Sequence, residues 1–114
     1  MNYDIVLHVD TDDNCMAVAL KNATNYANAL PDTAFGMVLL VNGAGVRQLA
    51  KTNEAIGDKL AEVMGRGLKV RACANALRDN NLTPEMLFDG VEVVPAGLVE
   101  LVHLQRAGYA YVKP

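Results

Sequence analysis

The sequence predicts an α/β protein: a three-layer α/β/α sandwich around a mostly parallel sheet of about five strands. Two observations lead to this prediction. Short apolar runs alternate with stretches of helical periodicity along the whole 114-residue chain. The second apolar run is hydrophobic at nearly every position, which is typical of a parallel strand buried on both faces. No linker, repeat or low-complexity segment interrupts this order, so we expect a single domain over residues 1–114.

The first half of the chain is predicted to supply two strands and two helices. Apolar runs with β-branched residues predict strands over 3–9 and 35–41, the second of them near the centre of the sheet. Apolar residues at three- and four-residue spacing predict a helix over about 14–30, which a proline ends. The glycine-rich segment 42–45 is expected to be a turn. The same helical spacing predicts a second helix over 54–65.

The second half of the chain is predicted to supply three further strands. The third strand ends on Cys73, and a brief helix begins immediately after it. Thr83 before Pro84 is typical of a helix start, so one or two helical turns are expected there. The last helix is more apolar than a solvent-facing helix should be, which indicates contact with another subunit. The remaining predicted elements are a strand over 91–94, that helix over 96–107 and a strand over 109–112.

Composition and charge disfavour several kinds of partner. Hydrophobic residues make up 52% of the chain, above the usual globular share, so we expect a subunit interface and a homo-oligomer. The net charge of −3 and the scattered Lys and Arg residues argue against nucleic-acid binding. No apolar run approaches the length that spans a bilayer, and no basic region precedes one. We therefore expect no membrane contact and a soluble, cytoplasmic protein.

Metal and dithiol chemistry are also disfavoured. The two cysteines, Cys15 and Cys73, lack Cys-x-x-Cys spacing, which argues against a disulfide framework, a four-cysteine zinc site and a redox dithiol. If the first and third strands flank the second, the cysteines lie about 9–10 Å apart, too far for a disulfide within one subunit. The acidic residues Asp10, Asp12 and Asp13 match no calcium-loop spacing, and capping of the first helix explains them. We expect no metal and no cofactor.

Cys73 is the first candidate for chemistry. A thiol at a strand-to-helix junction lies near unpaired backbone N–H groups and the positive end of a helix dipole, which favour the thiolate. The alternative is that Cys73 is a small buried residue at a tight junction, because free cysteine is among the most buried residue types. Cys15 also lies at a helix start, so the same argument applies to it. Its neighbour Met16 is on the predicted core stripe, so we expect Cys15 to be partly buried.

Two further positions are expected near Cys73, because the carboxyl ends of parallel strands meet at one edge of a sheet, where ligands bind. His8, near the end of the first strand, could hydrogen-bond a thiolate or a ligand, or could be a structural histidine. The turn at Asn42 and Gly43 could present backbone N–H groups to an anion. It lacks the glycine pattern of a dinucleotide site and the Lys-Ser/Thr of a P-loop, so an ordinary tight turn is the alternative. His103 is expected to be structural.

The landmarks of the chain, taken together, resemble the DsrE/DsrF-like family. They are Leu7-His8-Val9, Val-Asn-Gly-Ala-Gly-Val over 41–46, Ala-Cys-Ala-Asn-Ala-Leu over 72–77, Val-Val-Pro-Ala-Gly-Leu-Val-Glu-Leu over 93–101 and Gln-Arg-Ala-Gly-Tyr-Ala-Tyr over 105–111. The resemblance covers nearly the whole chain and implies a three-layer fold assembled into trimers or hexamers. In sulfur-relay members of this family, a cysteine after the third strand accepts a persulfide sulfur and passes it on. Cys73 matches that position, although the chain looks more like the small stand-alone members.

Two hypotheses follow from the resemblance and the residues. In the first, the chain is a single-cysteine persulfide carrier that exchanges sulfur with a donor or acceptor protein. Cys73 is then the nucleophile, Asn75 and the following N–H groups stabilise its thiolate, and His8, Asn42 and Gly43 shape the pocket. In the second, the same loops form a non-catalytic, oligomeric module that binds a small ligand or anion. The residues leave both hypotheses open, and with them the question of enzymatic activity.

Overall fold

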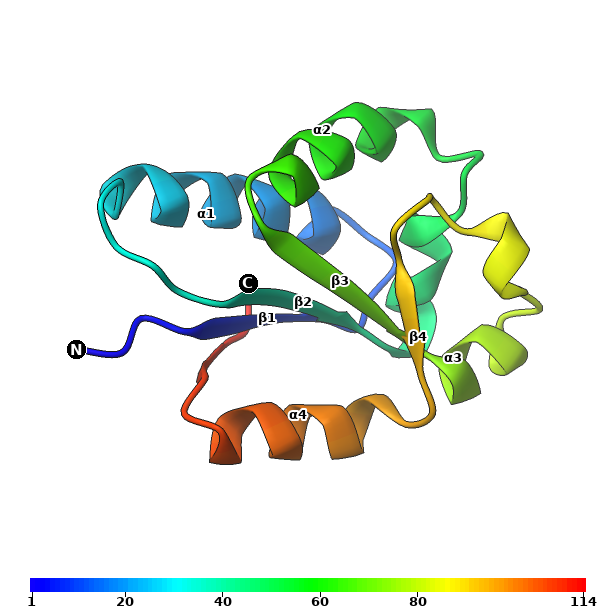
Figure 1. The fold of residues 1–114 in the computed structure, drawn as a ribbon. Helices are drawn as coiled ribbons and strands as arrows, with labels where there is room; N and C mark the ends of the chain where they lie inside the picture. Colours follow the sequence, from blue (N-terminus) through cyan, green and yellow to red (C-terminus); the bar gives the residue numbers. More distant parts are fainter.

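The sheet has five strands, all parallel, in the order β4-β3-β2-β1-β5 (Figure 1). The structure is a computed structural model that describes residues 1–114. The strands are β1 (Ile5–Val9), β2 (Met37–Val41), β3 (Leu68–Cys73), β4 (Glu92–Val94) and β5 (Ala110–Val112). The wholly apolar β2 lies at the centre and is flanked by β3 and β1, as the sequence predicts.

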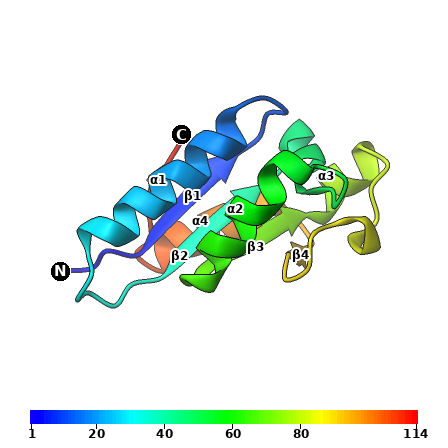
Figure 2. The ribbon, with the colours of Figure 1, turned by 90° about the horizontal axis from the view of Figure 1, so that it is seen from above.

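Helices cover both faces of this sheet. The helical elements are α1 (Cys15–Ala29), η1 (Gly43–Leu49), α2 (Glu54–Gly65), α3 (Ala74–Asp79), η2 (Pro84–Met86) and α4 (Gly97–Arg106). The α1 and α2 helices lie side by side on one face, and α4 alone covers the other (Figures 1 and 2). The predicted three-layer α/β/α class is therefore confirmed. Instead of a turn over 42–45, Asn42 is extended and residues 43–45 begin the longer 3-10 helix η1; the segment after Thr83 is also a 3-10 turn.

Two separate hydrophobic cores result from the alternation of side chains along the strands. The larger core, of 22 buried residues, lies between the sheet and the α1 and α2 helices. The smaller one lies under α4 and consists of Val6, Val38, Leu40, Leu101 and Leu104. On this side β3 presents Lys69 and Arg71 in register with Val38 and Leu40. The α4 layer is therefore the more polar and the less extensively buried of the two.

An ion-pair cluster holds α4 against the sheet where the small core ends. Arg71 of β3 donates a hydrogen bond of 3.0 Å to Glu100 of α4, and its Nε lies 3.7 Å from Glu92 of β4. The Arg71 and Glu100 side chains are both largely shielded from solvent. The cluster joins three elements and fixes the position of α4 over the sheet.

None of the helices is long and apolar enough to cross a bilayer.

Candidate functional site at the carboxyl edge of the sheet

Three side chains that the sequence singles out lie together at the carboxyl edge of the sheet. His8 is the penultimate residue of β1, Asn42 follows β2, and Cys73 ends β3. Val6 and Leu40 belong to the core under α4, so His8 and Asn42, two residues further along, lie on the same face. Cys73 is one of the 22 residues of the larger core, and its Cβ also lies close to the start of α4, where a Cβ built on Gly97 would be 3.1 Å away.

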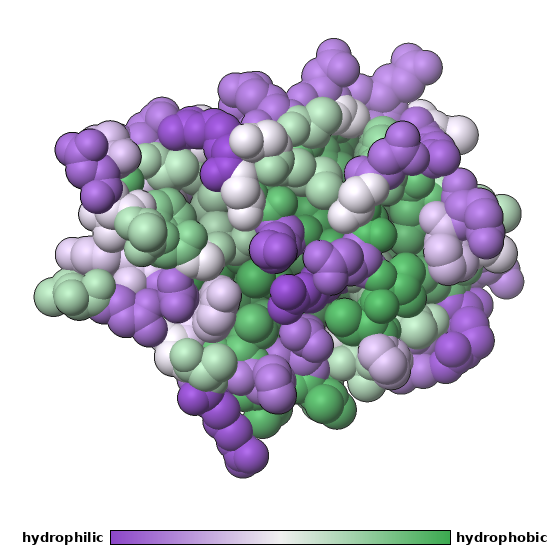
Figure 3. Space-filling view, viewed as in Figure 1, coloured by the Kyte–Doolittle hydropathy of each residue, from purple (hydrophilic) through white to green (hydrophobic).

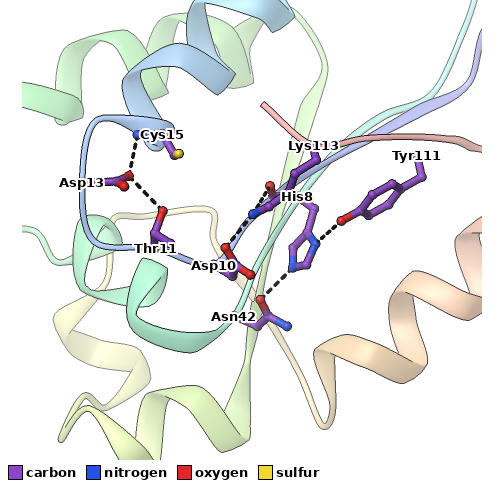
Figure 4. Close-up of polar contacts among 8 residues, drawn as sticks. All are labelled: His8, Asp10, Thr11, Asp13, Cys15, Asn42, Tyr111 and Lys113. Atoms are coloured by element: carbon purple, nitrogen blue, oxygen red, sulfur yellow. Dashed lines mark hydrogen bonds and ion pairs between the residues drawn. The ribbon is translucent and has the colours of Figure 1, made fainter.

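His8 is almost completely buried and links two neighbouring strands through its ring nitrogens (Figure 4). Its Nδ1 lies 2.6 Å from the hydroxyl of Tyr111 on β5, and its Nε2 lies 2.7 Å from Oδ1 of Asn42. An amide oxygen only accepts hydrogen bonds, so with Oδ1 facing the ring the Nε2–H group of His8 donates a hydrogen bond to Asn42. With the neutral ring, Nδ1 is then an acceptor, and the Tyr111 hydroxyl donates to it.

An ion pair closes the β5 side of this network. Lys113 Nζ lies 2.5 Å from Oδ1 of Asp10 and 3.4 Å from the backbone oxygen of His8 (Figure 4). The hydrogen bond from Lys113 lowers the pKa of the Asp10 carboxyl below its ordinary value. Because Asp10 follows β1 and Lys113 follows β5, the pair ties the ends of these strands together beside His8.

Cys73 is buried beneath the first residue of α4. Its exposed fraction is 6%, and as the N-cap residue of α3 it makes no side-chain capping hydrogen bond. A Cβ atom added to Gly97 would lie 3.1 Å from the Cβ of Cys73 and 3.3 Å from that of Asn42. A side chain at position 97 would therefore require one of these neighbours to shift by a few tenths of an ångström, and glycine avoids that crowding. None of the four surface cavities is lined by Cys73, His8 or Asn42, so the site is no open pocket.

The other two predicted site residues have different surroundings. Gly43 has a φ of +53°, and a Cβ there would lie 2.8 Å from the backbone oxygen of Asp10. It is therefore glycine because the chain passes close to the loop after β1. Asn75 lies on the exposed side of α3, where its Oδ1 accepts a hydrogen bond from Arg78. The structure does not bring the Asn75 side chain into the His8 network.

The acidic loop before α1 divides its contacts among several partners. Asp13 accepts hydrogen bonds from the Cys15 backbone N–H and from the Thr11 hydroxyl (Figure 4), and the former lowers the pKa of the Asp13 carboxyl most. Asp13 thus binds the first backbone N–H of α1, although the N-cap residue itself is Asn14. Asp10 pairs with Lys113, and Asp12 contacts Gln48 and Arg47 of η1, so the expectation that helix capping explains all three acidic residues is wrong for Asp10 and Asp12. No group of three or more His, Cys, Asp or Glu side chains is arranged to hold a metal ion. Both cysteines are free.

Sequence reasoning did not assign a role to Tyr111, Lys113 or Gly97. Tyr111 lies between Ala110 and Val112 in β5, and this alternation could have placed it on the face opposite to theirs. What the sequence did not reveal is that β5 pairs with β1, in register Tyr111 to Val6. That long-range pairing is what brings the hydroxyl to His8.

The model of the DsrE/DsrF-like family matches residues 5–114. The chain belongs to this family. Its members are generally related to sulfur relay. The matched region includes the three candidate site residues His8, Asn42 and Cys73. No curated protein matches the sequence.

Solved structures share the DsrE/DsrF-like fold. A protein of unknown function from Methanobacterium thermoautotrophicum, MTH1491, is 29% identical, with a TM-score of 0.85 over 99% of this chain and 100% of that one. YchN from E. coli is 15% identical, with a TM-score of 0.81 and full coverage of both chains. BT1422 from Bacteroides thetaiotaomicron, also of unknown function, is 15% identical, with a TM-score of 0.72 over 97% of this chain and 95% of that one. The last two likenesses concern the fold alone.

Proposed function

We propose that this chain is a cytoplasmic, single-cysteine sulfur carrier in which Cys73 accepts a sulfur atom as a persulfide and passes it on. The observation that carries the proposal is the place of Cys73: it ends β3 at the carboxyl edge, near Asn42, the partly buried hydrogen-bond partner of His8, in a DsrE/DsrF-like chain. Both cysteines are free thiols, the state that a reducing cytoplasm maintains.

The transfer is a displacement at sulfur. The Cys73 thiolate attacks the outer sulfur of a donor persulfide, the sulfur–sulfur bond of the donor breaks, and the inner donor sulfur leaves as a thiolate. Cys73 then holds the outer sulfur, and an acceptor thiolate removes it by the same step in reverse. Electrons balance without a further oxidant or reductant. The proposal therefore requires a donor and an acceptor thiol, supplied by protein partners, and no cofactor.

Self-association is part of the proposal. Leu98 and Val99, which directly follow the Gly97 contact to Cys73, expose 71% and 69% of their surface, and Val102 lies one turn further along. Apolar surface is also visible in Figure 3 among polar groups on the side where β4 and α4 lie. An exposed apolar helix stripe of this kind is typical of a subunit interface. A second copy of the chain docked there, in a trimer or hexamer, would lie next to the thiol.

The test is to react the protein with glutathione persulfide and to locate the added sulfur by mass spectrometry. We expect the mass of one sulfur atom on Cys73, retained in Cys15→Ser and lost in Cys73→Ser. Addition of a thiol acceptor should remove it. Sulfur on neither cysteine, or sulfur retained in Cys73→Ser, would show that Cys73 is not a carrier.

A second function, a non-catalytic module that binds a small anion, is favoured by the low exposure of the Cys73 thiol. It predicts a different pattern of results. Inorganic phosphate should then raise the melting temperature of the wild type and of Cys73→Ala alike, and Asn42→Ala should abolish the rise. Sulfur transfer to Cys73 with no such rise in melting temperature would exclude the binding module.

A further inference from the structure

The hydrogen bonds from Tyr111 to His8 and from His8 to Asn42 form one chain that crosses three strands and ends beside Cys73. We propose that this chain is a positioning device: it turns the Asn42 carboxamide so that its N–H groups face the sulfur atom carried by Cys73. The inference rests on the proposed function and adds to it a role for Asn42 and two positioning residues, His8 and Tyr111.

The proposed positioning device depends first on which ring nitrogen of His8 carries the proton. A neutral imidazole carries its proton on one nitrogen, and the partner of the other nitrogen decides which one. When the Tyr111 hydroxyl, 2.6 Å from Nδ1, donates to that nitrogen, the ring proton lies on Nε2, the nitrogen that faces Oδ1 of Asn42. His8 is 9% exposed, whereas Tyr111 is 42% exposed, so the bond lies where the buried ring meets the surface. A Tyr111 hydroxyl that donates to Nδ1 thus keeps His8 as a donor toward Asn42, and the proposed chain depends on this direction.

The second step is the orientation of the carboxamide. A side-chain amide can present either its oxygen or its nitrogen to one neighbour, because the two ends have nearly the same shape. The Nε2 proton of His8 captures Oδ1 at 2.7 Å, which turns Nδ2 to the other side. Figure 4 shows the nitrogen of Asn42 directed away from the imidazole. The structure gives Nδ2 no hydrogen-bond partner within the chain, so its two N–H groups are available to a ligand.

The third step is proximity to Cys73. The Cβ atoms of Cys73 and Asn42 lie within 3.1 Å and 3.3 Å of one point, the position of a Cβ on Gly97. A persulfide places its outer sulfur about 2 Å beyond Sγ, within the reach of a neighbouring side chain. That outer sulfur is the negatively charged atom of a persulfide anion. An N–H donor stabilises it, whereas an amide oxygen in the same place would repel it.

The experiment follows sulfur transfer from glutathione persulfide to Cys73 by mass spectrometry, in a Cys15→Ser background. We expect Tyr111→Phe, which removes only the hydroxyl, to slow the transfer about fivefold to tenfold, the usual effect of one lost hydrogen bond between neutral groups. Asn42→Asp, which replaces the N–H groups with an oxygen, should slow it more. The matched control is Tyr109→Phe: Tyr109 packs beside the core under α4, and its hydroxyl has no bond to His8.

A second readout, the imidazole nitrogen chemical shifts of His8 by NMR, reports the tautomer independently of sulfur chemistry. We expect the Nε2–H form in the wild type and in Tyr109→Phe, and a mixture of both tautomers in Tyr111→Phe. Unchanged transfer in Tyr111→Phe, or slowed transfer without a change of tautomer, would overturn the inference while the carrier function stands. Failure of the wild type to take up sulfur at Cys73 would instead overturn the carrier function and the inference with it.

Discussion

The Cβ of Cys73 lies in direct contact with the backbone of Gly97, the residue at which α4 begins. A Cβ added to Gly97 would lie 3.1 Å from that of Cys73, closer than ordinary van der Waals packing allows. The carboxyl end of β3 and the first turn of α4 thus meet with no side chain between them. The sulfur site and the position of α4 are therefore coupled, and a change at either one is felt at the other.

We expect Gly97→Val to destabilise the fold by about 1–3 kcal/mol, because the added side chain must displace Cys73, Leu40 or Asn42 in a packed site. Urea unfolding gives the change in free energy. Gly65→Val is the matched control, because a Cβ at Gly65 has no neighbour within 4 Å and its helix ends there. Equal stability of the two variants would show that the α4 contact with Cys73 is loose.

Substitution of a second glycine, Gly43, is also expected to destabilise the fold, for two reasons that can be measured separately. Gly43 combines a φ of +53° with a Cβ position only 2.8 Å from the Asp10 backbone oxygen, whereas Gly67, at a φ of +107°, has open space around it. Gly67→Ala therefore measures the strain of a positive φ without a steric clash. Gly43→Ala should cost more, measured by thermal and urea unfolding, because the loop after β1 must also move. A smaller loss at Gly43 than at Gly67 would contradict the close approach.

Much of this fold could be predicted from local sequence, whereas the completed site could not. The apolar β2 and the spacing of Ile56, Leu60 and Val63 in α2 specify elements whose burial the structure bears out. The same reasoning placed His8, Asn42 and Cys73 at one edge, because parallel strands share their carboxyl ends. The residues that complete the site, Tyr111 and Gly97, come from elements more than 50 residues further along the chain from His8. Their contacts depend on the pairing of β5 with β1 and on the position of α4 over the sheet. No local sequence pattern specifies either of these.

Lys113→Met is expected to raise the pKa of the Asp10 carboxyl toward its ordinary value of 3.8, since the Lys113 hydrogen bond is the main cause of the lowering. The folded pKa is depressed, so the pair stabilises the protein above the unfolded pKa and loses this effect as the pH falls through the folded value. Asp10 is 42% exposed, so screening limits the contribution to about 1 kcal/mol or less. NMR titration of the Asp10 carboxyl measures the shift. The control is Lys51→Met, which removes a separate surface ion pair with Asp89. An unchanged Asp10 titration in Lys113→Met would contradict the assignment of the lowered Asp10 pKa to Lys113.

Assembly through α4 predicts that a charge on its outer side dissociates the oligomer. We expect Val99→Lys to convert the wild-type assembly to monomers, because burying an unpaired ammonium group in an apolar interface is costly. Light scattering coupled to size-exclusion chromatography gives the mass of each form. The control is Val18→Lys on α1, which is also exposed but lies on the other face of the sheet. A wild type that is monomeric at high micromolar concentration, or a Val99→Lys variant that assembles fully, would exclude this interface.

The burial of Cys73 predicts that the site selects its reaction partners by size. Cys73 is 6% exposed under the start of α4, whereas Cys15 is half-buried at the start of α1. When iodoacetamide is replaced by a bulky maleimide dye, we expect the rate at Cys73 to fall roughly tenfold or more relative to that at Cys15, because the larger reagent must wait for α4 to open locally. Peptide mapping after timed labelling measures both rates, and labelling in urea, where both thiols are free, is the reference. Equal sensitivity of the two cysteines to reagent size would show that α4 does not cover the thiol in solution. In a carrier, such a cover would admit the slender end of a persulfide and exclude larger electrophiles, which protects the sulfur that Cys73 holds.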